Sequence, residues 1–130
     1  MEVIYSKEKL ISIEKSILTV GSYDGIHLGH RGLLSALVQK SKENGIPSIV
    51  VTFDPHPREI LNEKLNNFSL IMNLEQKLEI IDSYGVDFVY VINFTEEYSR
   101  ITANNFMNQT IVPFFNPKIV IIGSNHYFGR

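Results

Sequence analysis

Short runs rich in Val and Ile alternate along the chain with stretches of helical periodicity. The runs are predicted to be strands, and they cover residues 16–20, 48–53, 87–92 and 118–122, with a further short strand over residues 2–6. Apolar strands that are separated by helices form a parallel sheet covered on both faces. Because such crossovers are right-handed, the sequence predicts an α/β fold with a doubly wound, Rossmann-like parallel sheet.

Cap residues mark the helices between these strands. A helix is predicted over residues 31–44, and Gly45 is a suitable C-terminal stop. Asn73 and Gln76 have the spacing of a capping box for a second helix, which Gly85 ends.

The segment before the last strand is predicted to be mostly helical. Thr95 opens a helical region that restarts at Thr102 and runs to about residue 112. Pro113 and Pro117 are predicted to bracket a turn. The aromatic side chains around this segment are expected to form core and cover for the sheet rather than to stack on a ligand: Tyr84, Phe88, Tyr90, Phe94, Tyr98 and Phe106.

The composition excludes several classes of protein. The 130 residues include no cysteine, which rules out disulfides, thiolate nucleophiles and Cys-based zinc sites. The net charge is −2 and no long basic run is present, so we expect no nucleic-acid partner. No apolar run approaches membrane-spanning length, and the N-terminus carries charges where a signal peptide is apolar. We therefore expect one folded domain in the cytoplasm, away from the membrane; its oligomeric state stays open.

The residues that follow the first long strand combine glycines with two histidines. Ligands of a parallel sheet bind beyond the carboxyl ends of its strands, where this segment lies. Gly21, Gly25 and Gly29 remove side chains where backbone and ligand must come close. His27 and His30 project to the same side of a first helical turn and can donate to phosphate oxygens. The segment is predicted to bind a phosphate chain at a helix N-terminus.

Other interpretations of this turn remain open. A His-x-x-His spacing or a glycine-rich turn is usually structural when it occurs alone. His27, His30, His56 and Asp54 also have a spacing that fits a metal site, but a metal does not explain the glycines, so no dedicated metal site is predicted. Asp24 is expected to brace the turn through backbone N–H groups, with direct metal contact as the alternative.

A second loop with ligand-binding residues follows the strand over 48–53. Pro55 and Pro57 stiffen it, which lowers the entropy cost of holding ligand contacts. Arg58 is expected to hold a phosphate with two hydrogen bonds, assisted by His56. The alternative is a rigid turn in which Arg58 pairs with a neighbouring carboxylate, Glu59 or Glu63.

Three segments carry a resemblance to a known family. His27-Leu28-Gly29-His30 matches the His-x-Gly-His signature of the nucleotidyltransferase superfamily, which class I aminoacyl-tRNA synthetases share. The longer string from Gly21 to Leu34 resembles the bacterial FAD synthetases, although Phe is commoner than Tyr at position 23. The Thr52–Arg58 segment resembles the Thr-Phe-x-Pro-His-Pro-Arg motif of that family. The end of the chain resembles its Gly-x-Asp/Asn-x-x-Phe-Gly segment, with His126 at a position where Phe is frequent.

The resemblance implies an FMN adenylyltransferase, which transfers AMP from ATP to FMN and releases FAD and pyrophosphate. His27 and His30 would be its catalytic residues, and Mg²⁺ would arrive on the ATP phosphates. The implied ATP-binding residues are Gly21, Tyr23, Asp24, Gly25, His27, Gly29, His30, Gly123, Asn125, Phe128 and Gly129. The implied FMN-binding residues are Pro55, His56, Pro57 and Arg58.

Members of the family continue beyond this last segment with a basic stretch, a Ser/Thr-rich motif with an arginine, and a riboflavin kinase domain. Residues 1–130 are therefore expected to be an adenylyltransferase domain that is truncated at its C-terminus and lacks the kinase domain. Two alternatives stay open: a non-catalytic flavin- or nucleotide-binding fragment, and another nucleotidyltransferase of this superfamily, such as a cytidylyltransferase.

Overall fold

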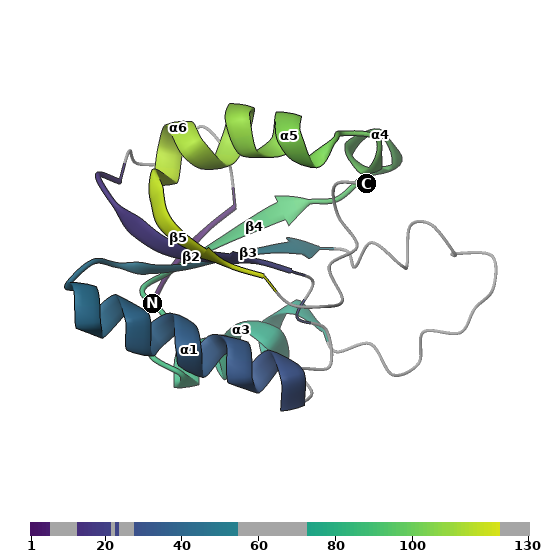
Figure 1. Cartoon of the computed structure of the whole chain (residues 1–130). Coiled ribbons are helices and arrows are strands. Elements are labelled where there is room, and N and C mark those ends of the chain that lie inside the picture. Colours follow the sequence, from purple (N-terminus) through teal and green to yellow (C-terminus); the bar gives the residue numbers. More distant parts are fainter. Residues whose placement is uncertain (6–12, 22, 24–27, 55–72, 123–130) are drawn as a thin grey trace.

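In the described part of the chain, five parallel strands form one sheet with helices on both faces (Figure 1). The computed structural model describes residues 1–5, 13–21, 23, 28–54 and 73–122, with side chains from Arg31 onward in the first helix. The elements are β1 (Glu2–Ile4), β2 (Ser16–Val20), α1 (Leu28–Asn44), β3 (Ser48–Asp54), α3 (Leu74–Ser83), β4 (Phe88–Asn93), α4 (Glu96–Ser99), α5 (Ala103–Phe106), the π-helical turn η3 (Met107–Ile111), α6 (Val112–Phe115) and β5 (Pro117–Ile121). The four long strands lie within one residue of their predicted ends, and β1 is shorter than predicted.

The strand order β1-β4-β3-β2-β5 confirms the doubly wound prediction. The chain moves from β2 outward to β3 and β4, then returns to place β5 on the other side of β2. Helices α1 and α3 cover one face, and α4, α5 and α6 lie over the other (Figure 1). In such a sheet the ligand crevice lies where the winding reverses, beyond the carboxyl ends of the two strands between which it reverses. Here those strands are β2 and β5.

Strand side chains alternate between two apolar cores, one on each face of the sheet. The α1–α3 core consists of Ile17, Tyr23, Leu34, Leu37, Val38, Val50, Ile81, Val86, Val89 and Val91. The opposite core consists of Ile4, Leu18, Val20, Ile49, Val51, Phe53, Tyr90, Ile92, Phe94, Phe106, Ile111 and Phe115. The predicted structural role of the aromatic side chains is confirmed, since each of the six is buried in or packed against one of these cores.

Side-chain caps start three of the helices where the sequence predicted them. The Gln76 amide donates to Asn73 Oδ1 over 2.8 Å, and the Asn73 amide donates to Gln76 Oε1 over 3.2 Å, which completes the capping box of α3. Thr95 and Thr102 each accept a backbone N–H over 3.1 Å, at the starts of α4 and α5. These contacts use N–H groups that the first turn of a helix leaves without an intrahelical partner.

The turn predicted between Pro113 and Pro117 is confirmed, but it is shorter than predicted, because the helix ends three residues later than residue 112. Pro113 lies just after the π-helical turn η3, and the helix continues through it to Phe115. The reversal occurs at Asn116, whose φ of 39° is left-handed and whose Nδ2 donates to the Glu14 carbonyl over 2.6 Å.

Candidate nucleotide site

The carboxyl edge of the sheet is stepped, because β3 and β4 extend further than β2. Pairing between β2 and β3 ends with Val20 opposite Val51, after which the Gly21 amide donates to the Val51 carbonyl over 3.0 Å. Pairing between β3 and β4 continues to Asp54 opposite Asn93. The chain therefore leaves β2 beside the last residues of β3, which extend beyond the end of β2.

Tyr23 folds back over the end of β2 and fills the α1–α3 core. Its side chain is only 1% exposed, and its hydroxyl lies 2.6 Å from Thr19 Oγ1. Its φ of 53° is left-handed, which is uncommon for a residue with a side chain. A Cβ atom on Gly21 would lie 2.9 Å from the Tyr23 ring, closer than van der Waals contact permits. The glycine is therefore required here by packing, in addition to any approach of a ligand.

Helix α1 begins at Leu28, three residues earlier than predicted. Gly29 and His30 thus belong to its first turn, where a helix tolerates glycine because the N–H groups make no intrahelical bonds. No acidic residue occupies this first turn. The positive end of the helix dipole and its N–H groups therefore point toward the carboxyl edge of the sheet without a competing carboxylate in that turn, which suits an anion.

The structure brings several predicted site residues to this edge and leaves others outside its described part. Gly21 and Tyr23 follow the end of β2, and Gly29 and His30 belong to the first turn of α1. The predicted residues outside the described part are Asp24, Gly25, His27, Pro55, His56, Pro57, Arg58, Gly123, Asn125, Phe128 and Gly129. Their segments adjoin the carboxyl ends of β2, β3 and β5, which Figure 1 shows at one edge of the sheet.

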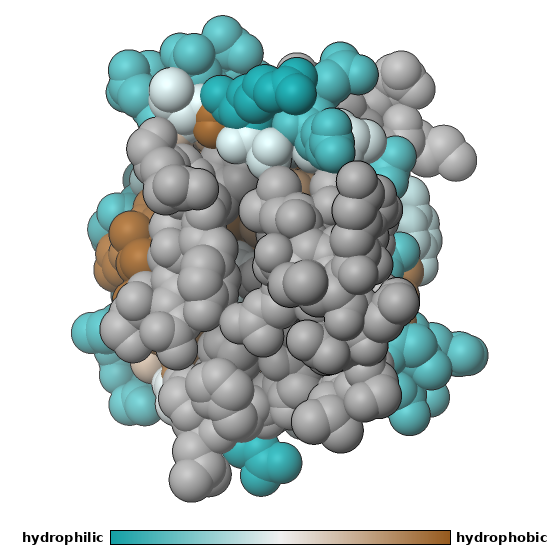
Figure 2. Space-filling model, turned by 90° about the vertical axis from the view of Figure 1, so that its right-hand side faces the viewer, coloured by the Kyte–Doolittle hydropathy of each residue, from teal (hydrophilic) through white to brown (hydrophobic). Residues whose placement is uncertain are grey.

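Figure 2 views this edge directly, and the described residues visible around its rim are mainly hydrophilic. Among the described residues, none form a group of three or more His, Asp or Glu side chains able to hold a metal ion. The prediction of no dedicated metal site remains untested, since His27 and His56 lie outside those residues.

Lys77 is a buried residue near this edge that was not predicted from the sequence. Its side chain on α3 is 2% exposed, and its Nζ donates to the Phe53 carbonyl over 3.1 Å and to Thr52 Oγ1 over 3.3 Å. The available signal was its position four residues before Ile81, which places both on the inward face of the helix.

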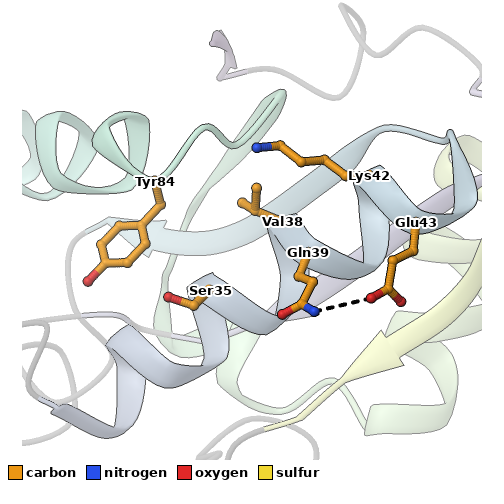
Figure 3. Close-up of a pocket in the computed structure, with 6 residues that line it drawn as sticks. All are labelled: Ser35, Val38, Gln39, Lys42, Glu43 and Tyr84. Atoms are coloured by element: carbon orange, nitrogen blue, oxygen red, sulfur yellow. Dashed lines mark hydrogen bonds between the residues drawn. The ribbon is translucent and has the colours of Figure 1, made fainter.

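A shallow pocket of about 470 Å³ lies away from this edge, between the second half of α1 and the end of α3 (Figure 3). Its lining residues are Ser35, Val38, Gln39, Lys42, Glu43 and Tyr84. Gln39 Nε2 donates to Glu43 Oε2 over 3.1 Å, so two of the polar groups are paired with each other along α1. The pocket has neither the switch-point position nor the helix N-terminus that the carboxyl edge offers.

The buried Tyr23 predicts an alkaline limit to stability. Burial raises the pKa of its hydroxyl to about 12, with the Thr19 hydrogen bond acting in the opposite direction. The unfolded chain ionises near pH 10. Stability is therefore complete below pH 10 and is lost as pH rises from 10 toward 12, by on the order of 2–3 kcal/mol for this group. Urea unfolding at pH 8, 10 and 11 should show this decline.

Tyr23→Phe should flatten that decline without abolishing it, because burial and Tyr90 also raise the pKa of Tyr98 to about 12. Tyr5→Phe removes a phenol that is 59% exposed and serves as the matched control. Identical pH slopes in wild type and Tyr23→Phe would contradict the assignment.

A parallel sheet with a glycine turn and an open helix N-terminus at its switch point defines a Rossmann-like α/β protein. A sequence model described as FAD synthetase matches residues 10–130. The chain therefore belongs to the FAD synthetase family.

Two curated relatives carry the description bifunctional riboflavin kinase/FMN adenylyltransferase. The protein of Buchnera aphidicola subsp. Schizaphis graminum is 34% identical over 126 residues, covering 97% of this chain and 39% of the relative. The Escherichia coli K12 protein is 32% identical over 117 residues, covering 89% of this chain and 37% of the relative. The chain thus spans about two fifths of the length of these relatives.

A solved structure shares the fold. It is described as a macrolide-efflux protein from Streptococcus pneumoniae, and it superposes with a TM-score of 0.78 at 25% identity, covering 94% of this chain and 42% of that one. The efflux role belongs to the description of that protein. In the part of this chain that the structure describes, no helix has the length and apolar character needed to cross a bilayer.

Proposed function

We propose that this chain is the adenylyltransferase domain of a FAD synthetase, which transfers AMP from ATP to FMN. The observation that carries the proposal is the connection from β2 to α1 at the switch point of the sheet. It contains the His27–His30 motif and ends in a helix whose first turn holds no acidic residue. The family of the chain and the activity named for its relatives support the same reaction.

In the proposed reaction a phosphate oxygen of FMN attacks the α-phosphorus of ATP. The new P–O–P bond gives FAD, and the bond to the β-phosphate breaks to release pyrophosphate. No covalent enzyme intermediate is required, so the work of the protein is alignment and charge stabilisation. His27 and His30 would donate to the triphosphate, together with backbone N–H groups of the first turn of α1.

Of the other two segments at the carboxyl edge, one would bind FMN and the other would bind the adenosine of ATP. The loop after β3 would bind FMN, with Arg58 on its phosphate and Pro55, His56 and Pro57 shaping the loop. The segment after β5 would hold adenosine through Gly123, Asn125, Phe128 and Gly129. Asp24 and Gly25 would shape the phosphate turn, and Tyr23 would support it from the core.

The substrates in this proposal are ATP and FMN, and Mg²⁺ would be carried by the ATP phosphates rather than by a protein cage. Residues 1–130 would form the adenylyltransferase part of a longer bifunctional enzyme, as the shared length with its relatives suggests. A cytoplasmic location belongs to the same proposal, because a chain without cysteine suits a reducing compartment.

The direct test uses the product of the complete reading frame, supplied with Mg²⁺, FMN and either ATP or CTP. We expect FAD and pyrophosphate in equal amounts with ATP, and no flavin dinucleotide with CTP. Transfer from CTP to a phosphorylated acceptor would replace the proposal with a cytidylyltransferase. Calorimetric binding of FMN and ATP without formation of FAD would identify a non-catalytic module.

A further inference from the structure

Lys77 places an amine in an almost completely buried position of α3, where its side chain is 2% exposed. An amine loses its hydration there, which is costly unless hydrogen bonds replace the water. Its Nζ meets two oxygens of β3, the Phe53 carbonyl at 3.1 Å and Thr52 Oγ1 at 3.3 Å. The side chain therefore joins the N-terminal part of α3 to the end of the neighbouring strand.

The step in the sheet explains why the end of β3 needs such a donor. Carbonyl groups alternate in direction along a strand, so that of Phe53 faces the same side as that of Val51. The Val51 carbonyl accepts from the Gly21 amide, which is the last contact of β2 with β3. The Phe53 carbonyl lies beyond that ladder, and Lys77 donates to it on the side where β2 has ended.

Helix α3 holds Lys77 firmly in this position. The capping box of Asn73 and Gln76 fixes the start of the helix, and the Lys77 amide donates to the Asn73 carbonyl over 3.1 Å. One turn further on, Ile81 is fully buried in the α1–α3 core. The cap and the core therefore position the ammonium group from both sides.

We propose that Lys77 is a positioning residue for the acceptor side of the site. By holding Thr52 and the Phe53 carbonyl, it fixes the end of β3 at Asp54, the residue after which the proposed FMN-binding segment begins. The proposal rests on the proposed function, in which that segment binds FMN. In the proposed function ATP binds at the ends of β2 and β5 instead. Loss of Lys77 should therefore weaken the binding of FMN and leave that of ATP unchanged.

The test compares Lys77→Met, which keeps an unbranched side chain but removes the donors, with wild type and with Ile81→Val. Ile81→Val trims the same face of α3 away from the sheet edge and serves as the control for lost stability. In the full gene product we expect Lys77→Met to raise KM for FMN about tenfold while KM for ATP changes less than about twofold. Ile81→Val should leave both KM values unchanged while lowering Tm.

Thr52→Val removes one of the two acceptors that β3 offers to Lys77, and it serves as the test if Lys77→Met does not fold. It should raise KM for FMN alone, by about threefold. Equal changes in both KM values, no change in either, or the same split in Ile81→Val would overturn the role of Lys77.

Hydrogen exchange separates this proposal from the proposed function. The Phe94 amide donates to the Asp54 carbonyl over 3.3 Å and so reports on the end of β3. Lys77→Met, or Thr52→Val in its place, should lower protection at Phe94 more than Ile81→Val does at matched Tm. If wild type makes no FAD, the proposed function fails, and exchange at Phe94 alone decides whether Lys77 holds β3. Unchanged protection would overturn that role.

Discussion

Replacing both His27 and His30 with alanine is expected to lower kcat for FAD formation by about a thousandfold or more, because donors aimed at the developing charge of phosphoryl transfer are lost. His30 lies in the first turn of α1, beside the end of β2. The change adds no bulk and breaks no described core contact, so Tm should stay within about 2 °C of wild type. Steady-state kinetics with saturating ATP and FMN measure the loss.

Gln39→Ala is the matched control for the histidine variant. Gln39 lies on the same helix, is exposed, and hydrogen-bonds only with Glu43 among the contacts described for its side chain. Its removal should leave kcat unchanged. Full turnover by the doubly substituted enzyme would refute the assignment of the phosphate site, and a large fall in Tm would show that the histidines hold the fold instead.

Tyr23→Ala is expected to remove about 3–5 kcal/mol from the free energy of unfolding, as for other large aromatic side chains cut from a core. Tyr23 is among the largest fully buried side chains of the described residues. This loss is a large part of the free energy of unfolding of a typical domain, which is about 5–15 kcal/mol. Urea denaturation at pH 7 measures the change, and a loss below about 1 kcal/mol would contradict the core position of Tyr23.

A second pair of variants separates the hydroxyl of Tyr23 from its ring. Tyr23→Phe leaves the buried Thr19 hydroxyl without the 2.6 Å contact, at an expected cost of about 1–2 kcal/mol. Thr19→Val combined with Tyr23→Phe replaces both partners with apolar groups and should recover most of that loss. Additive losses in the double variant would show that the two hydroxyls do not act as a pair.

Much of the fold could be predicted because local signals agree with the sheet. The strands are rich in Val and Ile because both faces of the sheet are covered. Asn73, Thr95 and Thr102 cap helices through contacts with residues only three positions away. The end of α6 could not be predicted in this way. Pro113 alone predicts a break, but the π-helical turn η3 precedes it and the helix continues through it to Phe115.

The sequence predicts where the candidate site lies, but it does not reveal all of the residues around it. The glycines and histidines after β2 indicated a phosphate turn, and the strand order places that turn at the switch point. The sequence could not reveal that Tyr23 turns inward with a left-handed φ, or that Lys77 reaches the end of β3. Both depend on contacts between segments whose relative placement only the folded sheet defines.

The central claim is that the triphosphate of ATP binds at the N-terminus of α1, beyond the carboxyl ends of β2 and β5. A crystal structure with a non-hydrolysable ATP analogue and Mg²⁺ tests it most directly. We predict density for the phosphates against the first turn of α1, with His30 in hydrogen-bonding distance of a phosphate oxygen. Phosphates bound elsewhere, such as in the pocket beside Ser35 and Tyr84, with that first turn left empty, would contradict it.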